Sequence, residues 1–122
     1  IEGQKHGIRV NCLAPTAATR MTEGLMPEDV LRALDPAAVV PAMLVMASRE
    51  APNRTVLCAG AGTFEAAHIT LTQGVHVGFD AQTPERLAAQ LAEVCERQGD
   101  MVPQSGSAQG ANEVGKALGH TV

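Results

Sequence analysis

The chain has 122 residues, the length of about one domain, and a formal net charge of −4 that comes without any acidic or basic run. Its lysines are Lys5 and Lys116, and the basic residues do not cluster, so neither nucleic acid nor an anionic membrane is expected as a partner. No window reaches 18 apolar residues and no basic start precedes an apolar stretch, which predicts neither a membrane span nor a signal peptide.

The three cysteines are far apart in sequence, and each lies among apolar residues. This pattern predicts reduced core thiols in a reducing compartment and favours a cytoplasmic location. Their spacing fits neither a metal site nor a catalytic nucleophile, so no metal ligand is expected. The cysteines are Cys12, Cys58 and Cys95.

The chain begins with a polar stretch that ends at Gly7, as the last turn of a helix does. We therefore expect the body of that helix to precede residue 1, in a longer protein. Residues 8–14 are apolar except for Arg9 and Asn11, which predicts a short strand covered on both faces, as in a parallel sheet. Pro15 ends the strand because it has no N–H to donate.

Prolines organise the next segment. Pro27 opens a short helix of about two turns, and Asp35 followed by Pro36 is a helix start signal. An interior proline costs about 3 kcal/mol, so we predict one turn over residues 36–40 and a main helix that restarts at Pro41 and runs to about residue 48. That helix is apolar nearly all round, which predicts that it is buried.

A second apolar strand is expected over residues 55–59, followed by an alternating edge strand over residues 66–72. Thr83 and Pro84 open an amphipathic helix that Gly99 closes. Residues 103–122 are rich in Gly, Ser, Gln and Ala, so we expect them to be loosely ordered.

Two segments compete as the ligand site. Gly60-Ala61-Gly62 follows a strand and Asp80 lies downstream, a superficial match to a dinucleotide fingerprint. The third glycine position is Glu65, which brings a negative charge where a pyrophosphate belongs, so a tight loop at a sheet edge is the favoured interpretation.

The other candidate is the loop over residues 11–22. Ligands of parallel sheets lie beyond the carboxyl ends of the strands, and small residues at positions 16–18 let a flat polar ligand approach the backbone. From the residues alone, an ordinary connection between a strand and a helix is an equal alternative.

The order and spacing of several short motifs resemble the short-chain dehydrogenase/reductase family. The similarity is greatest to the C-terminal portion of the 3-hydroxyacyl-CoA dehydrogenase domain of peroxisomal multifunctional enzyme type 2 and its bacterial relatives. It covers roughly residues 1–75, with a weaker echo over residues 84–98. The matching segments are residues 2–11, Ala14-Pro15, residues 20–23, Pro27-Glu28, residues 36–41 and Gly60-Ala61-Gly62.

The resemblance implies an α/β fold, the C-terminal part of a Rossmann-type parallel sheet with a helical substrate lid and a C-terminal helix. Residues 1–80 would belong to the dehydrogenase domain, residues 81–102 to the C-terminal helix, and residues 103–122 to a loose tail. It also implies NAD or NADP as cofactor and a 3-hydroxyacyl-CoA or similar hydroxy or keto substrate. An oligomer is expected, in the cytoplasm or, in a eukaryote, the peroxisome.

The resemblance assigns roles within the loop over residues 11–22 and the segment after it. Carried over position by position, the nicotinamide end of the cofactor would lie against Pro15, Thr16, Ala18 and Thr19. The substrate lid would include Arg20, Met21, Leu25 and Met26. Thr16 stands where the wider family commonly has glycine.

The family performs hydride transfer with a Ser and a Tyr-x-x-x-Lys, whose lysine lowers the pKa of the tyrosine. This chain contains no tyrosine, so it holds no catalytic residue and should be inactive alone. Its histidines are scattered and are expected to be solvated or structural. The alternative is a non-catalytic α/β interaction module, or a subunit completed by another chain. The histidines are His6, His68, His76 and His120.

Overall fold

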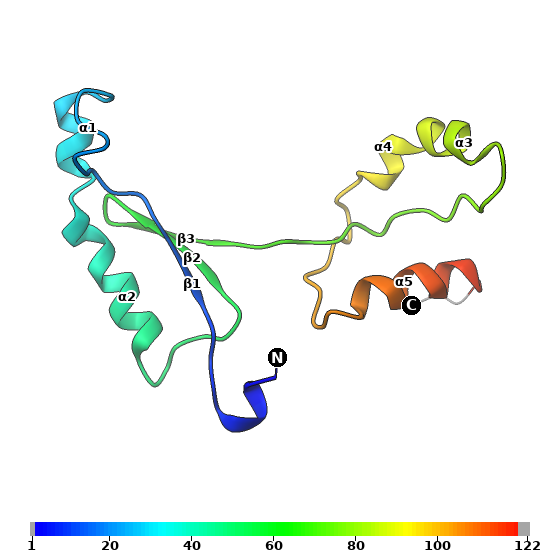
Figure 1. The fold of residues 1–122 in the computed structure, drawn as a ribbon, viewed down its shortest axis with the longest axis horizontal. Helices are drawn as coiled ribbons and strands as arrows, with labels where there is room; N and C mark the ends of the chain where they lie inside the picture. Colours follow the sequence, from blue (N-terminus) through cyan, green and yellow to red (C-terminus); the bar gives the residue numbers. More distant parts are fainter. Residues whose placement is uncertain (1, 120–122) are drawn as a thin grey trace. The chain divides into compact units, whose positions relative to one another are not determined.

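The computed structural model describes residues 2–119 and divides the chain into two compact units, Ile1–His68 and Ile69–Val122 (Figure 1). The first unit contains a 3-10 turn η1 (Gln4–His6), strands β1 (Cys12–Pro15), β2 (Val56–Gly60) and β3 (Thr63–Ala67), and helices α1 (Glu28–Ala33), η2 (Pro36–Val39) and α2 (Val40–Ala47). The second contains α3 (Thr83–Ala89), α4 (Leu91–Val94) and α5 (Ala108–Ala117). The histidine at position 120 lies outside the described residues.

The sheet of the first unit is mixed, with the order β1-β2-β3. β1 and β2 run parallel and place Cys12 beside Val56 and Pro15 beside Ala59, whereas β2 and β3 are antiparallel. The strand predicted over residues 8–14 is shorter and shifted, because only Cys12–Pro15 pairs with a neighbour. As predicted, the strand ends at Pro15.

The side chain of Asn11 fixes the register of the two parallel strands. Its amide nitrogen donates to the Pro52 carbonyl at 2.8 Å, and its oxygen accepts from the Thr55 N–H at 3.1 Å. A second bridge runs from the Val10 N–H to the Asn53 side-chain oxygen at 2.9 Å. These bonds join the start of β1 to the turn that precedes β2.

Gly60-Ala61-Gly62 forms the turn of a β-hairpin between β2 and β3. Ala61 and Gly62 have φ values of 50° and 74°, the left-handed conformations that a two-residue hairpin turn requires. The turn sends the chain straight back as β3, so no helix follows and the dinucleotide fingerprint is wrong. The edge strand accordingly lies at Thr63–Ala67, earlier than the predicted residues 66–72.

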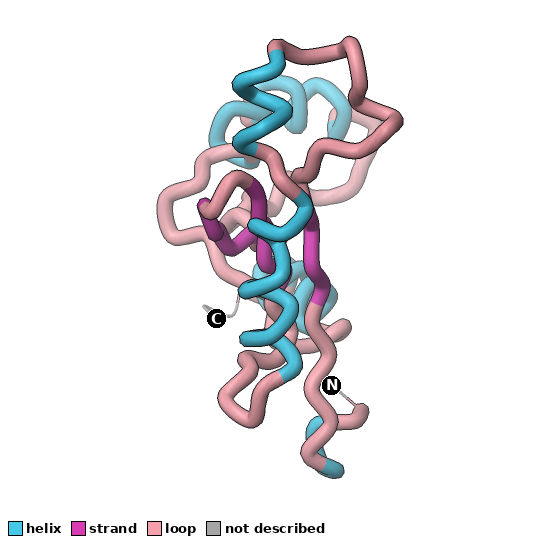
Figure 2. Tube along the Cα trace, turned by 90° about the vertical axis from the view of Figure 1, so that its left-hand side faces the viewer, coloured by secondary structure: helices cyan, strands magenta, loops and turns pink. Residues whose placement is uncertain are grey.

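The helices of the first unit follow the prolines, as predicted. The Asp35 carboxylate accepts a hydrogen bond from the Ala37 N–H at 2.8 Å and so caps η2. Pro41 lies in the first turn of α2, where its missing N–H costs nothing. Figure 2 shows α2 running beside the strands.

The prediction that α2 is buried is wrong. Of its residues only Ala42 is buried, whereas the side chains of Met43, Leu44 and Val45 are 60%, 65% and 57% exposed. The physical reason is a shortage of covering structure, because three short strands can bury one face of an all-apolar helix but not the others. Val10, which lies in the predicted strand but before β1, is also exposed, against the expectation of cover on both faces.

The accessible surface of the chain, 9309 Å², is large for its mass. Two separate compact domains of these sizes would expose roughly 7,400 Å². The only buried apolar residues in the described part of the chain are Ala42, Ala51 and Ala59. The described residues therefore form a thin core and leave much apolar surface accessible.

The second unit is held together by bonds from its first residues to the end of α4 and to the segment after it. Leu71 and Met101 exchange both backbone hydrogen bonds at 2.9 Å, and the Thr72 hydroxyl donates to the Val94 carbonyl at 2.7 Å. The single helix expected after Thr83 is interrupted at Gln90, between α3 and α4. Helix α5 forms within the stretch for which the sequence predicts little order.

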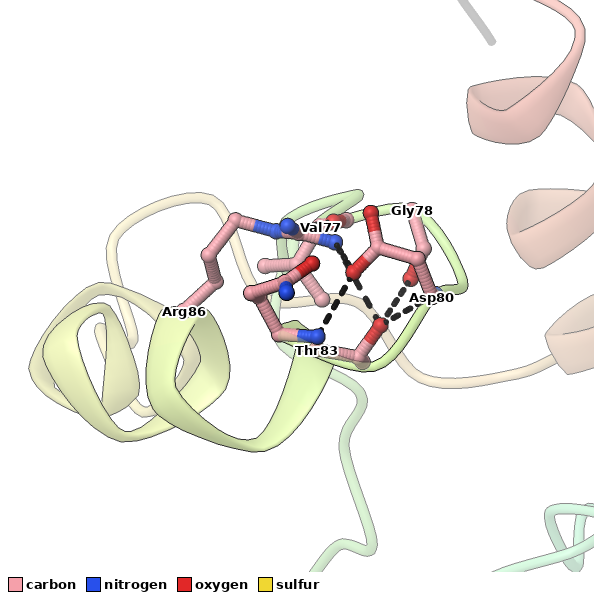
Figure 3. A network of polar contacts seen from close by, with 6 residues as sticks. Val77, Gly78, Asp80, Thr83 and Arg86 are labelled. Carbon is pink, nitrogen blue, oxygen red and sulfur yellow. Dashed lines mark hydrogen bonds and ion pairs between the residues drawn. The ribbon is translucent and has the colours of Figure 1, made fainter.

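A polar network closes the loop that precedes α3 (Figure 3). The Arg86 guanidinium donates to the Val77 carbonyl at 2.8 Å and pairs with the Asp80 carboxylate at 2.9 Å. The Asp80 N–H donates to the Thr83 hydroxyl at 2.8 Å, which starts the helix. The loop held by this network carries Phe79, whose side chain is fully exposed.

Within residues 2–119, no helix combines the length and the apolar character that a membrane crossing needs.

Candidate functional site

The loop after β1 lies at the carboxyl ends of the two parallel strands, where parallel sheets bind ligands. Both ends of its first part are anchored through the backbone. The Thr16 N–H donates to the Ala59 carbonyl at the end of β2 at 2.8 Å, and the Ala18 N–H donates to the Leu34 carbonyl at 2.7 Å. Residues 16–18 are therefore held between the sheet and the end of α1.

A compact turn follows, built by two threonines. The Thr22 hydroxyl donates to the Thr19 carbonyl at 2.8 Å and accepts from the Thr19 N–H at 2.9 Å. The Thr19 hydroxyl accepts from the Met21 N–H at 3.3 Å. Thr19, predicted as a cofactor contact, thus has a second role in shaping the chain toward the lid.

Two hollows flank this loop. One has a volume of about 370 Å³ and contains Ala18, Thr19 and Arg20 from the predicted site, with Glu23 and Leu31. The other has a volume of about 310 Å³ and lies at the ends of the strands. Its lining joins the loop to the hairpin through Thr16, Leu34, Cys58, Ala59, Gly60, Ala61, Thr63 and Glu65.

The structure thus divides the predicted site residues between two places. Pro15 and Thr16 lie at the strand ends, while Ala18, Thr19 and Arg20 line the first hollow. The predicted lid residues are open to solvent: Met21 is 88% exposed, Leu25 74% and Met26 40%.

Three structural features of this site were not predicted from the sequence. Asn11 holds the strand register, the Leu34 carbonyl anchors the loop, and Gly60 lies against Thr16. Asn11 was recognisable as the one amide inside an apolar strand. A backbone anchor such as Leu34 leaves no sequence signal. The sequence places Gly60 in a tight loop and in a family motif, but it does not indicate the close contact with Thr16.

Titratable groups are sparse around the loop. The pKa of Asp100, in the second unit, lies below its ordinary value of 3.8 because the Thr70 hydroxyl and then the Arg97 guanidinium donate hydrogen bonds to the carboxylate. His6, His68 and His76 are exposed and scattered. Across residues 2–119, no three His, Cys, Asp or Glu side chains gather as a metal site would need.

The cysteines differ from the expectation of core thiols. Cys12 and Cys95 are exposed and Cys58 is half-buried, while all three are free. The same thinness of the core that exposes α2 explains this difference.

Comparison with known proteins finds relatives among dehydrogenases, although no protein-family model matches the chain. A Mycobacterium tuberculosis protein named as a short-chain type dehydrogenase/reductase is 35% identical over 101 residues, which are 81% of this chain and 35% of that protein. Peroxisomal multifunctional enzyme type 2 of Mus musculus is 33% identical over 108 residues, or 86% of this chain and 15% of the mouse protein. The chain thus spans about a third of the first relative and less of the second.

One solved structure shows the same fold. Full-length peroxisomal multifunctional enzyme type 2 from Drosophila melanogaster matches with a TM-score of 0.74 and 17% identity, over 97% of this chain and 22% of that protein. The expected α/β fold class is therefore confirmed.

The chain is therefore a homologue of short-chain dehydrogenases/reductases. This homology supports an oxidoreductase family for the chain. Within that class, the recurring relative is peroxisomal multifunctional enzyme type 2. The resemblance stated from the sequence is confirmed.

Proposed function

We propose that this chain supplies the nicotinamide-facing loop and the substrate lid of an NAD(P)-dependent oxidoreductase. The proposed substrate is a 3-hydroxyacyl-CoA or a similar hydroxy or keto compound. One observation carries the proposal: in a homologue of short-chain dehydrogenases, a loop of small residues is tied by its backbone to the carboxyl ends of two parallel strands. This is where an open α/β sheet binds its ligand.

The residues present fit one end of the cofactor. Thr16, Ala17 and Ala18 are small, and hollows of about 310 and 370 Å³ flank them, so a flat carboxamide-bearing ring could approach the backbone. NAD(P), when bound, accepts or supplies the hydride. Pro15, Thr16, Ala18 and Thr19 would hold its nicotinamide end. The hairpin at Gly60 is no dinucleotide-binding turn, so the pyrophosphate must be bound by other residues.

The chain contains no tyrosine for the acid–base step. We therefore assign the catalytic Ser, Tyr and Lys to residues outside this sequence and propose that the chain alone is inactive. The exposed apolar face of α2 and the large accessible surface support completion by further structure. As part of such an enzyme, the chain would be located in the cytoplasm or, in a eukaryote, in the peroxisome. We propose that residues 1–80 belong to the dehydrogenase domain.

The second candidate is a non-catalytic α/β interaction module, or a subunit completed by another chain. The observation that favours it is the apolar hollow of about 280 Å³ between α2 and the sheet, lined by Pro41, Ala42, Val45, Leu57 and Phe64. An uncovered apolar surface of this kind is typical of an interaction site. It marks a contact that either candidate needs, but it provides no chemistry.

The coding sequence upstream of Ile1 separates the two candidates. If the dehydrogenase proposal is correct, that upstream sequence encodes a Gly-rich turn, a Ser and a Tyr-x-x-x-Lys. A stop codon immediately upstream of Ile1 would refute the proposal. For the protein, NAD(P)H fluorescence titration is the corresponding test. The 122-residue chain should show no tight binding, whereas the longer protein should bind NAD(P)H and, with NAD(P)+ as hydride acceptor, should oxidise a 3-hydroxyacyl-CoA to the 3-keto compound.

A further inference from the structure

Gly60, the last residue of β2, packs directly against the proposed cofactor loop. A Cβ atom built on Gly60 would lie 2.8 Å from the Thr16 carbonyl oxygen and 2.9 Å from the Thr16 Cβ. Both separations are shorter than real Cβ contacts. Any side chain at position 60 must therefore displace Thr16 or the end of β2.

Neither neighbour can move freely. The Thr16 N–H is bonded to the Ala59 carbonyl at 2.8 Å, and Ala59 itself is 3% exposed and paired with both adjacent strands. Two residues further along, the Ala18 N–H is bonded to Leu34 at 2.7 Å. A shift of the Thr16 carbonyl would strain the anchors on either side of it.

The requirement for glycine at this position is steric. Gly60 does not have a left-handed φ, so its backbone conformation is open to other residues. Gly62, in contrast, has a φ of 74° and open space around its Cβ position. The two glycines of Gly60-Ala61-Gly62 thus serve different ends. Gly62 permits the hairpin turn, and Gly60 permits the close approach of the loop.

We propose that Gly60 is a positioning residue for the cofactor loop. Gly60 acts through Thr16. Because Gly60 has no side chain, the backbone of the loop packs directly on the end of β2, and this contact sets the position of residues 16–19 relative to the sheet. The inference rests on the proposed function and adds a determinant of cofactor binding outside the loop itself. A displacement of about 1 Å at a ligand-positioning group reduces activity by up to roughly a hundredfold.

The test compares four variants in the longer protein that is proposed to contain this chain. Gly60→Ala introduces the Cβ. Gly106→Ala is the matched control, because no atom lies within 4 Å of its Cβ position. The double variant Gly60→Ala/Thr16→Gly removes the Thr16 Cβ and gives the residue 16 carbonyl more freedom to turn. It is compared with Thr16→Gly alone, because Thr16 is itself a proposed cofactor contact. The readouts are the KM for NAD(P)H, kcat and the melting temperature of each variant.

We expect Gly60→Ala to raise the KM for NAD(P)H at least tenfold, with Gly106→Ala unchanged. In the Thr16→Gly background, the same Gly60→Ala change should raise the KM much less. An unchanged KM in a folded Gly60→Ala protein overturns the inference, and so does an equal increase in both backgrounds. Loss of folding in both Gly60 variants also overturns it, since the role is then structural. An unmodified full protein without NAD(P)-dependent activity refutes the proposed function itself, whatever the variants do.

Discussion

Replacing Asn11 by alanine tests how the site is held in register. The side chain makes two hydrogen bonds, to the Pro52 carbonyl at 2.8 Å and from the Thr55 N–H at 3.1 Å, and the variant loses both. A typical hydrogen bond contributes about 0.5–1.5 kcal/mol, so the free energy of unfolding should fall by about 1–3 kcal/mol. For a unit of this size, each kcal/mol lowers the melting temperature by about 4–8 °C.

Circular dichroism melting measures this shift, and Asn112→Ala is the matched control. Asn112 lies on α5 in the second unit and has no hydrogen bond of its side chain in the structure, so its loss should change stability by less than about 0.5 kcal/mol. Hydrogen exchange of the Thr55 amide gives a local readout and should accelerate only in Asn11→Ala. Equal melting temperatures and equal Thr55 exchange in the two variants would refute the role of the Asn11 side chain in holding the two strands in register.

Four further results are expected. Ala61→Gly should stabilise the hairpin by up to about 1 kcal/mol in a melt, because Ala61 has a φ of 50°, and destabilisation would contradict the turn geometry. Arg86→Met should raise the proteolysis rate of the loop before α3, and an unchanged rate would count against the network. The second unit should lose stability as the pH falls below 3.8, because protonating Asp100 in that range removes a stabilised carboxylate; Asp100→Asn should flatten this dependence in an acid titration. The exposed apolar side chains of α2 should cause the isolated chain to self-associate, and Leu44→Lys should reduce this association in sedimentation because the Leu44 side chain is 65% exposed. Unchanged sedimentation would contradict a role of α2 in self-association.

Local signals in the sequence predicted much of the first unit. Pro15 ends β1, Asp35 caps η2 through the Ala37 N–H, and Pro41 begins α2. Each of these features depends on the chemistry of one or two neighbouring residues, such as a missing N–H or a carboxylate near a helix start. Such features are readable from the sequence whatever packs around them.

Long-range packing was not predictable in the same way. The burial expected for α2 follows from its composition, but it needs covering structure that residues 2–119 do not provide. In the second unit, the helix predicted to continue to Gly99 ends earlier, and Arg97 pairs with Asp100 at 3.0 Å instead of with Glu93 one helical turn before it. The helix ends before Arg97, so the i,i+4 spacing no longer applies.

The candidate site shows the same division. Sequence motifs placed the loop of small residues correctly at the end of a strand. The contacts that hold this loop come from the Ala59 and Leu34 carbonyls and from the missing side chain of Gly60. Backbone partners of this kind depend on the fold, and side-chain identity does not encode them.

We propose that the nicotinamide end of NAD(P) lies against Pro15, Thr16, Ala18 and Thr19. Amide hydrogen exchange of the longer protein, measured with and without NAD(P)H, gives a local readout of this contact. The bound cofactor should slow exchange at the N–H groups of residues 16–19. Cofactor binding that protects other segments and leaves residues 16–19 unchanged would contradict it.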